Sequence, residues 1–73
     1  MDKYYLSNEG MARFKRMRIS GEARFEGFEI LEYLYEHGSS TADELTGHTG
    51  LSRSQLTELL MTFIHHGFIE GRE

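Results

Sequence analysis

The stretch LTGHTGLSRSQLTELLMTFIHHGFIE, residues 45–70, contains two short apolar segments separated by a turn with glycine. Apolar residues in its second half recur at the spacing of one helix face: Leu56, Leu59, Leu60, Phe63 and Ile64. This pattern predicts a helix over about residues 52–66. Gly67 is suited to end it in a left-handed conformation, and Phe68 is then expected to contact Phe63 in a Schellman arrangement. "FIEG", the next four residues, is predicted to be a short strand.

Two capping boxes mark the starts of two helices. Ser52 and Gln55 form one, in which the serine hydroxyl and the glutamine side chain satisfy free backbone N–H groups. Thr41 and Glu44 form the other and predict a short helix that ends near residue 47 or 48. Gly50 permits the positive φ of a sharp turn between them. Together these signals predict two helices at an angle to each other.

Two more helical patterns precede this pair. Ser7 is a predicted N-cap for a helix of about residues 8–18 with a largely basic exposed side, and its apolar side comprises Met11, Phe14 and Met17 or Arg18. Residues 21–37 predict an amphipathic helix capped by Ser20. Its polar side is an acidic stripe of Glu22, Glu26, Glu29 and Glu36. Gly27 within this run marks either a close approach of another helix or weak helix formation in the first turns.

The composition is that of one small folded domain spanning residues 1–73, with 38% hydrophobic and 27% charged residues. Cysteine is absent, so no disulfide or thiolate site holds the fold, which fits a reducing cytoplasm. No apolar run approaches the roughly 20 residues that span a bilayer, and the first ten residues lack the order of a secretory signal. We therefore expect a cytoplasmic protein without membrane contact.

The charge is distributed unevenly along the chain. Residues 1–20 carry five basic and two acidic residues, a net +3, whereas residues 21–73 carry three basic and ten acidic residues, a net −7. The total of −4 argues against a protein that coats nucleic acid. The basic N-terminal segment is either a phosphate-binding surface or a solvated helix face, and the sequence leaves both open.

Residues 28–70 resemble the winged helix-turn-helix modules of bacterial and archaeal transcription regulators. The matching parts are, in order, a first helix, the strand-like link "SST", a second helix, the turn, a recognition helix and "GFIE" as the first wing strand. The resemblance covers more than half of the chain and implies DNA binding in general terms. The expected fold is mainly α with a small β component: a helix-turn-helix core and wing strand over residues 21–70, preceded by a basic strand and helix over residues 1–20.

The expected wing departs from that family, in which the chain turns back after the first wing strand and forms a second. Here the chain ends at Glu73. Residues 3–6, "KYYL", alternate and are aromatic, so they are candidates to pair with residues 68–71. We expect a two-stranded wing built from both chain ends.

The resemblance implies that the helix over residues 52–66 enters the major groove of DNA. The candidate DNA-binding residues are Ser52, Arg53, Ser54 and Thr57 on this helix, and Arg13, Lys15 and Arg16 near the N-terminus. Arg53 is suited both to reading a guanine edge and to holding a phosphate. The alternative is that the serines are only caps and Arg53 is solvated, and Glu58 disfavours tight binding.

The remaining residues indicate neither an enzyme nor a resident cofactor. His65 and His66 are adjacent, so they do not form the i, i+4 pair of a metal site, and His37 and His48 are better explained as helix-end residues. No nucleophile, base and orienting group occur together.

The rival function is a protein-interaction module that uses the acidic helix over residues 22–36 or exposed tyrosines. A homodimer through the N-terminal helix is compatible with either function.

Overall fold

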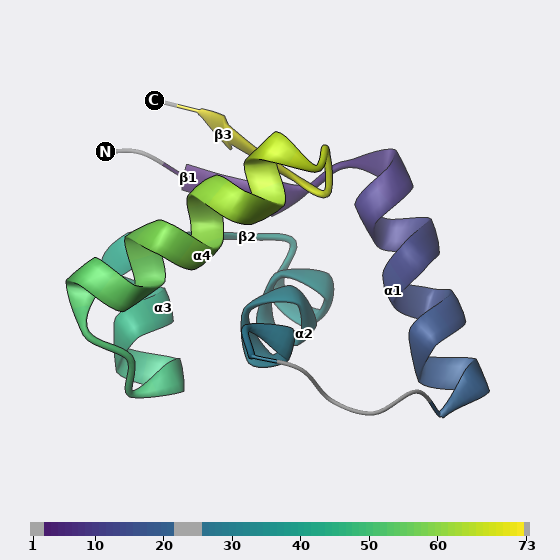
Figure 1. Ribbon diagram of the computed structural model, residues 1–73, viewed down its shortest axis with the longest axis horizontal. Coiled ribbons are helices and arrows are strands. Elements are labelled where there is room, and N and C mark those ends of the chain that lie inside the picture. Colours follow the sequence, from purple (N-terminus) through teal and green to yellow (C-terminus); the bar gives the residue numbers. More distant parts are fainter. Residues whose placement is uncertain (1–2, 22–25, 73) are drawn as a thin grey trace.

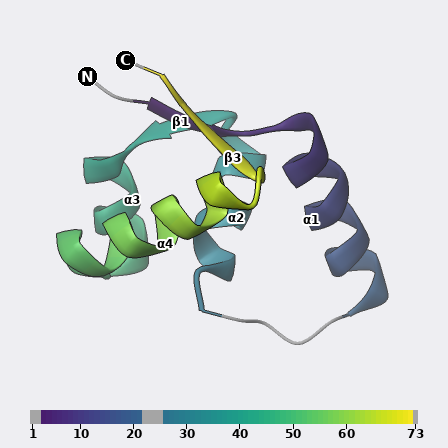
Figure 2. The ribbon, with the colours of Figure 1, turned by 45° about the horizontal axis from the view of Figure 1, so that its top comes forward.

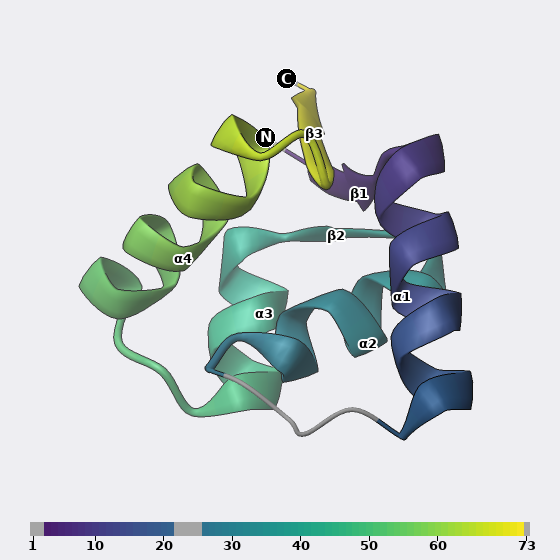
Figure 3. The same ribbon diagram turned by 45° about the vertical axis from the view of Figure 1, so that its right-hand side comes forward.

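The computed structural model describes residues 3–21 and 26–72, which form four helices and three short strands. In chain order these are β1 (Lys3–Leu6), α1 (Asn8–Ser20), α2 (Phe28–His37), β2 (Ser39–Thr41), α3 (Ala42–Thr49), α4 (Arg53–His65) and β3 (Ile69–Arg72). α1 and α4 lie on opposite sides of the molecule, with α2 and β2 between them (Figures 1 and 3). The predicted mainly α fold with a small β component is confirmed.

The three strands form an antiparallel sheet of order β2-β1-β3, so the first strand of the chain is the central one (Figure 3). β1 and β3 lie together in Figure 2. Residues 3–6 pair with residues 69–72, which confirms the predicted pairing of the two chain ends. β3 begins one residue later than the expected range 68–71, and Phe68 lies opposite Ser7, whose N–H donates to its backbone carbonyl at 2.9 Å.

The two-stranded wing expected from the chain ends is present as β1 and β3, and β1 also pairs along its other edge. On the second edge it pairs with β2, the segment that the sequence presented only as a strand-like link. Ser40 at the centre of β2 is buried, so its backbone groups need hydrogen-bond partners that water does not supply, and β1 provides them.

α1 begins where the sequence predicts and ends two residues later. The backbone N–H of Gly10 donates to the hydroxyl of Ser7 at 2.9 Å, which confirms Ser7 as the N-cap. The helix continues through Ser20, whose hydroxyl donates to the carbonyl of Met17 at 3.2 Å. The expectation that Ser20 caps the next helix is therefore wrong. Gly21, with φ of 69°, closes α1 instead.

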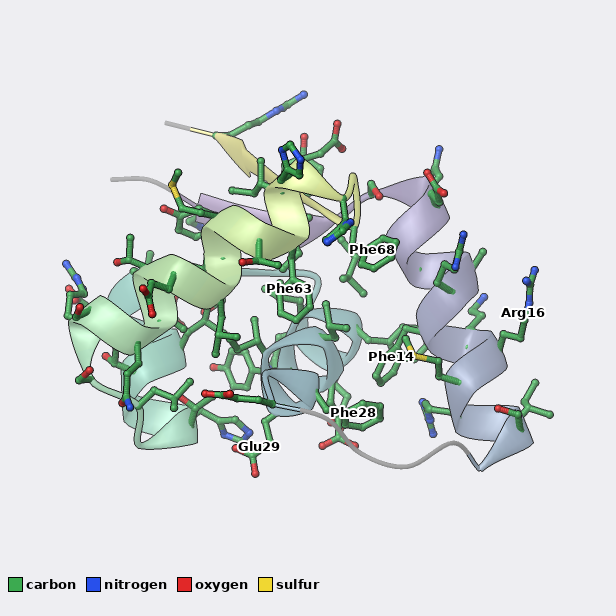
Figure 4. The ribbon with its side chains drawn as sticks, viewed as in Figure 1. Phe14, Arg16, Phe28, Glu29, Phe63 and Phe68 are labelled. Atoms are coloured by element: carbon green, nitrogen blue, oxygen red, sulfur yellow. The ribbon has the colours of Figure 1, made fainter. Side chains whose placement is uncertain are left out.

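α1 packs on the rest of the molecule through Gly10 and Phe14. Phe14 is fully buried, and its ring centroid lies 5.3 Å from that of Phe28 on α2 (Figure 4). A Cβ on Gly10 would lie 2.1 Å from the backbone carbonyl oxygen of Phe68, so only glycine fits where α1 passes the segment between α4 and β3. Met11, predicted on the apolar side, is 38% exposed because Gly10 occupies the inward position.

α2 starts at Phe28, so the predicted start of this helix at residue 21 is wrong, and residues 22–25 of the prediction lie outside the described part of the chain. Gly27 precedes it with φ of 93°, a left-handed conformation that a regular helix does not contain. A Cβ on Gly27 would lie 2.9 Å from the ring atom Cζ of Phe63 on α4. The close approach of another helix, one of the two explanations offered for Gly27, is therefore present, and this glycine precedes α2 rather than lying within it.

The acidic stripe is correspondingly shorter than predicted. Glu29 and Glu36 lie on α2 and are exposed, whereas Glu26 precedes the helix. Glu22 lies outside the described residues.

Both predicted capping boxes are present at the starts of α3 and α4. In the first, Glu44 N–H donates to the Thr41 hydroxyl at 3.2 Å and Thr41 N–H donates to the Glu44 carboxylate at 3.0 Å. In the second, the reciprocal bonds between Ser52 and Gln55 are both 3.1 Å. α3 extends to Thr49, slightly past its predicted end.

The two helix ends of this unit are closed by glycines in the left-handed conformation. Gly50, with φ of 76°, ends α3 and turns the chain toward α4. After α4, Phe68 N–H donates to the carbonyl of Phe63 at 2.9 Å and Gly67 N–H donates to that of Ile64 at 3.0 Å. This pair of bonds is the predicted Schellman motif. It directs the chain from α4 into β3.

A single hydrophobic core joins the sheet to all four helices of the described residues. Its members are Leu6, Phe14, Phe28, Ile30, Leu31, Leu34, Leu45, Leu56, Leu60, Phe63 and Ile69. α4 contributes three of these residues, so one of its faces is committed to the core and the opposite face is left to solvent. Ile64, predicted on the apolar face, is 41% exposed.

Candidate nucleic-acid interface

α4 presents a polar outer face with one large apolar side chain. Its exposed residues on that side are Ser54, Thr57, Glu58, Met61, Thr62 and His65. At 13 residues the helix is about 20 Å long. An α-helix of this kind fits the major groove of B-DNA, which is about 12 Å wide.

The hydroxyl groups of Ser52, the N-cap of α4, and of Thr57 differ in the further hydrogen bonds that they can form. Ser52 accepts the capping bond from Gln55 N–H through its oxygen, which leaves its hydroxyl proton free to donate to a phosphate or a base. Thr57 donates its proton to the carbonyl of Arg53 at 2.8 Å, so its oxygen is left to accept. Capping and DNA contact are therefore compatible roles for Ser52.

Arg53, the first residue of α4, is not free in solution. Its Nη1 forms an ion pair with Oδ1 of Asp43 on α3, and both side chains are largely exposed, at 62% and 75%. The pair connects the two helices across the turn at Gly50. The sequence did not reveal it, because residues ten positions apart on two helices meet only once the angle between the helices is known.

A shallow groove runs beside this ion pair, between α4, the start of α3 and β1. It is lined by Tyr4, Thr41, Ala42, Asp43, Arg53, Thr57, Leu60, Met61 and Ile64. Met61 is 64% exposed here. The groove places the central strand of the sheet next to the outer face of α4.

The basic residues of α1 lie elsewhere. Arg13, Lys15 and Arg16 are exposed on α1, and the side chain of Arg16 points away from α4 (Figure 4). Arg13 lies 4.0 Å from Glu9 and stacks over the ring of Phe68 at 5.7 Å. The structure brings Ser52, Arg53, Ser54 and Thr57 together, and it does not bring the α1 residues to them.

Two other basic residues lie at the end of the sheet. Lys3 on β1 and Arg72 on β3 are direct cross-strand partners, and both are exposed. The guanidinium of Arg72 lies 5.7 Å from the ring centroid of Tyr5. Sequence reasoning paired these chain segments but did not propose the two cations as contacts. To predict that Lys3 lies opposite Arg72, the register of the two strands must be known.

The start of α3 carries a carboxylate whose charged form is stabilised. Two hydrogen bonds from Thr41, first from its backbone N–H and second from its hydroxyl, hold the pKa of Glu44 below its usual value. The positive charges of Lys3 and His37 act in the same direction.

The histidines show aromatic contacts. The ring of Tyr33 lies 4.2 Å from that of His37 and 4.6 Å from that of His48, and His65 and His66 meet edge to face at 5.9 Å. Within residues 3–21 and 26–72, no three histidine or acidic side chains are grouped as metal ligands. None of the helices described here is both long and apolar enough to cross a bilayer.

Two capped helices joined by a tight turn, a third helix behind them and a small antiparallel sheet beside the second capped helix define a winged helix-turn-helix domain. The model of the IclR helix-turn-helix domain matches residues 26–73. The chain belongs to this family, whose members are DNA-binding domains of prokaryotic transcription regulators. No curated protein and no solved structure matches the chain significantly.

The matched part begins just before α2, so β1 and α1 lie outside it. The central strand of the sheet thus comes from a segment that the family match does not include. The central wing strand, β1, comes first in the chain and the edge strand, β3, comes last. In the family pattern described above, both wing strands instead follow the recognition helix.

Proposed function

We propose that this domain binds double-stranded DNA in the cytoplasm with the N-terminal half of α4 in the major groove. The observation that carries the proposal is the outer surface at the start of α4, where Ser52, Arg53, Ser54 and Thr57 are exposed together while the opposite face is buried in the core. Free N–H groups and the positive end of the helix dipole lie at this same end.

The side chains of this surface are suited to different parts of a duplex. The remaining proton of Ser52 and the first-turn backbone N–H groups suit phosphate oxygens, which position the domain. Arg53 and Thr57 lie one helical turn apart and are placed to reach base edges, arginine as a donor to guanine and threonine as an acceptor from an amino group.

Lys3 and Arg72 give the sheet a positive end and are further candidates for phosphate contacts. Contacts from the sheet and from α4 together would set the orientation of the domain on the duplex, because two separated anchors remove rotation about either one.

Arg13, Lys15 and Arg16 play a secondary role in this proposal. α1, which carries them, lies on the opposite side of the molecule from α4 (Figure 1), so they attract the duplex through their field or contact flanking DNA. We accordingly expect their substitution to reduce affinity less than substitution of Arg53.

A second candidate function is protein binding, which the exposure of Met61 beside Tyr4 in the groove favours. The acidic residues Glu29 and Glu36 on α2 offer another surface for a protein partner. We also propose that the domain can self-associate through α1.

The test is a titration of isotope-labelled protein with a random-sequence duplex, first at low and then at higher salt, with the perturbed amides mapped on the structure. We expect shifts at residues 52–57 and at the sheet end, and we expect them to weaken with salt. An unchanged spectrum at low salt would refute the DNA-binding proposal and direct attention to a protein partner.

A further inference from the structure

The ion pair between Asp43 and Arg53 has no part in the helix caps. The capping box of α3 uses Thr41 and Glu44, and the hydrogen bond that the structure shows for the Asp43 carboxylate comes from Arg53. Asp43 nevertheless lies in the first turn of α3, directly facing the first residue of α4. The carboxylate of Asp43 therefore contacts Arg53 and not the end of its own helix.

Arg53 is the one lysine or arginine on α4, so Asp43 offsets the strongest positive charge that this helix brings to a duplex. A phosphate that approaches Arg53 must either displace the carboxylate or tolerate its charge nearby. Phosphates are present at every step of every duplex, so this repulsion applies to all sequences equally.

A base edge requires hydrogen-bond donors of Arg53 in a fixed arrangement and not only its charge. The guanidinium is planar and has five N–H donors, of which the contact to Asp43 involves Nη1. The Nε and Nη2 donors remain and suit the two acceptors of a guanine edge. A guanidinium already held in place also loses less side-chain freedom when it binds, which favours a target at one fixed position.

We propose that Asp43 is a specificity-determining residue: it weakens the contact of Arg53 with phosphates of any sequence and holds its guanidinium for a single base edge. The inference rests on the proposed function. It deepens that function by assigning a role to a carboxylate that contacts Arg53 and no part of the helix cap.

The experiment measures the affinity of four proteins for two duplexes over a range of salt concentrations. The proteins are the wild type, Asp43→Asn, Arg53→Gln and the double variant. One duplex has random sequence, and the other is selected by the wild-type protein from a randomised pool. Glu29→Gln, which removes an exposed carboxylate from α2, is the matched control for charge (Figure 4).

For Asp43→Asn we expect tighter binding to the random duplex, with the slope of log affinity against log salt steeper by about 0.9, the value for one additional phosphate contact. We expect the ratio of selected to random affinity to fall about tenfold, within the range for loss of one arginine–guanine contact. In the Arg53→Gln background, the Asp43 substitution should change neither quantity. Glu29→Gln should leave the ratio unchanged.

An equal effect of Asp43→Asn with and without Arg53 would overturn the inference, because it would mean that any nearby carboxylate acts in the same way. An unchanged ratio would overturn it too. Arg53→Lys is an independent arm: it keeps the charge and removes the planar fork, so the ratio should fall while random-duplex binding persists. Wild-type protein that binds neither duplex would instead refute the proposed function.

Discussion

Replacing Gly10 by alanine tests how α1 is attached to the rest of the fold. In an exposed helix interior, glycine to alanine stabilises by about 1 kcal/mol. At position 10 the added Cβ would lie 2.1 Å from the carbonyl oxygen and 2.8 Å from the carbonyl carbon of Phe68. The obstacle is backbone, so it cannot move aside as a side chain does, and α1 must shift.

That shift strains the contacts that dock α1. Ser7 N–H donates to the carbonyl of Phe68 at 2.9 Å, and the Ser7 hydroxyl donates to the carbonyl of Gly67 at 2.6 Å. Overpacking of this kind costs about 1–3 kcal/mol, and each net hydrogen bond contributes about 1 kcal/mol. After the helix-propensity gain we expect a net loss of about 2 kcal/mol in the free energy of unfolding.

Gly47 on α3 is the matched control. It also lies within a helix, its φ is not positive, and a Cβ there would meet nothing within 4 Å. Gly47→Ala should therefore stabilise by about 0.5–1 kcal/mol. Urea and thermal unfolding followed by circular dichroism measure both variants. For a domain of this size, a loss of about 2 kcal/mol corresponds to a Tm lower by about 10 °C.

The close approach of Phe68 to Gly10 requires the free energy of unfolding to fall in Gly10→Ala and to rise in Gly47→Ala. A Gly10→Ala protein as stable as the Gly47→Ala protein would refute the reasoning, because α1 would then have room at the crossing. A gain at both positions would show that helix propensity, and not the approach of Phe68, decides the outcome.

Three more outcomes concern the helix starts and the proposed DNA-binding surface. Ser52→Ala should lower the free energy of unfolding by about 1 kcal/mol in urea titrations, because it removes the cap of α4; unchanged stability would exclude a role for that cap. Since the pKa of Glu44 is lower in the folded protein than its ordinary value of 4.5, its stabilisation is present above that pH and is lost as the pH falls through the folded-state pKa. Urea titrations in acid should thus show a smaller pH-dependent loss for Glu44→Gln than for the wild type, and parallel profiles would contradict this. Arg53→Gln should weaken binding to the selected duplex about tenfold, whereas Arg16→Gln should weaken it less, as filter binding would show; equal losses would remove the distinction between α4 and α1.

Local signals predicted much of this fold because their chemistry lies within a few residues. Each capping box joins a side chain to a backbone group three positions away, and the Schellman motif after α4 spans six residues. The misplaced start of α2 has a local cause as well. The periodic pattern continued upstream through Gly27, but the left-handed conformation of that glycine interrupts the helix there.

The candidate site was predicted only in part. Ser52, Arg53, Ser54 and Thr57 follow from the position of the recognition helix, and they are exposed together in the structure. Neither the partner of Arg53 nor the cross-strand pairing of Lys3 with Arg72 follows from periodicity, because each joins residues on different elements.

The sequence by itself determined the helices, their caps, the turn at Gly50 and the tendency of the two chain ends to form strands. Only the tertiary structure decided that β1 is the central strand, that Gly10 lies against a backbone carbonyl, and that Asp43 holds Arg53. The physical reason is the distance along the chain over which each interaction acts. Helix propensity and capping act over one turn of chain, whereas strand order, close crossings and ion pairs between helices depend on how the whole core packs.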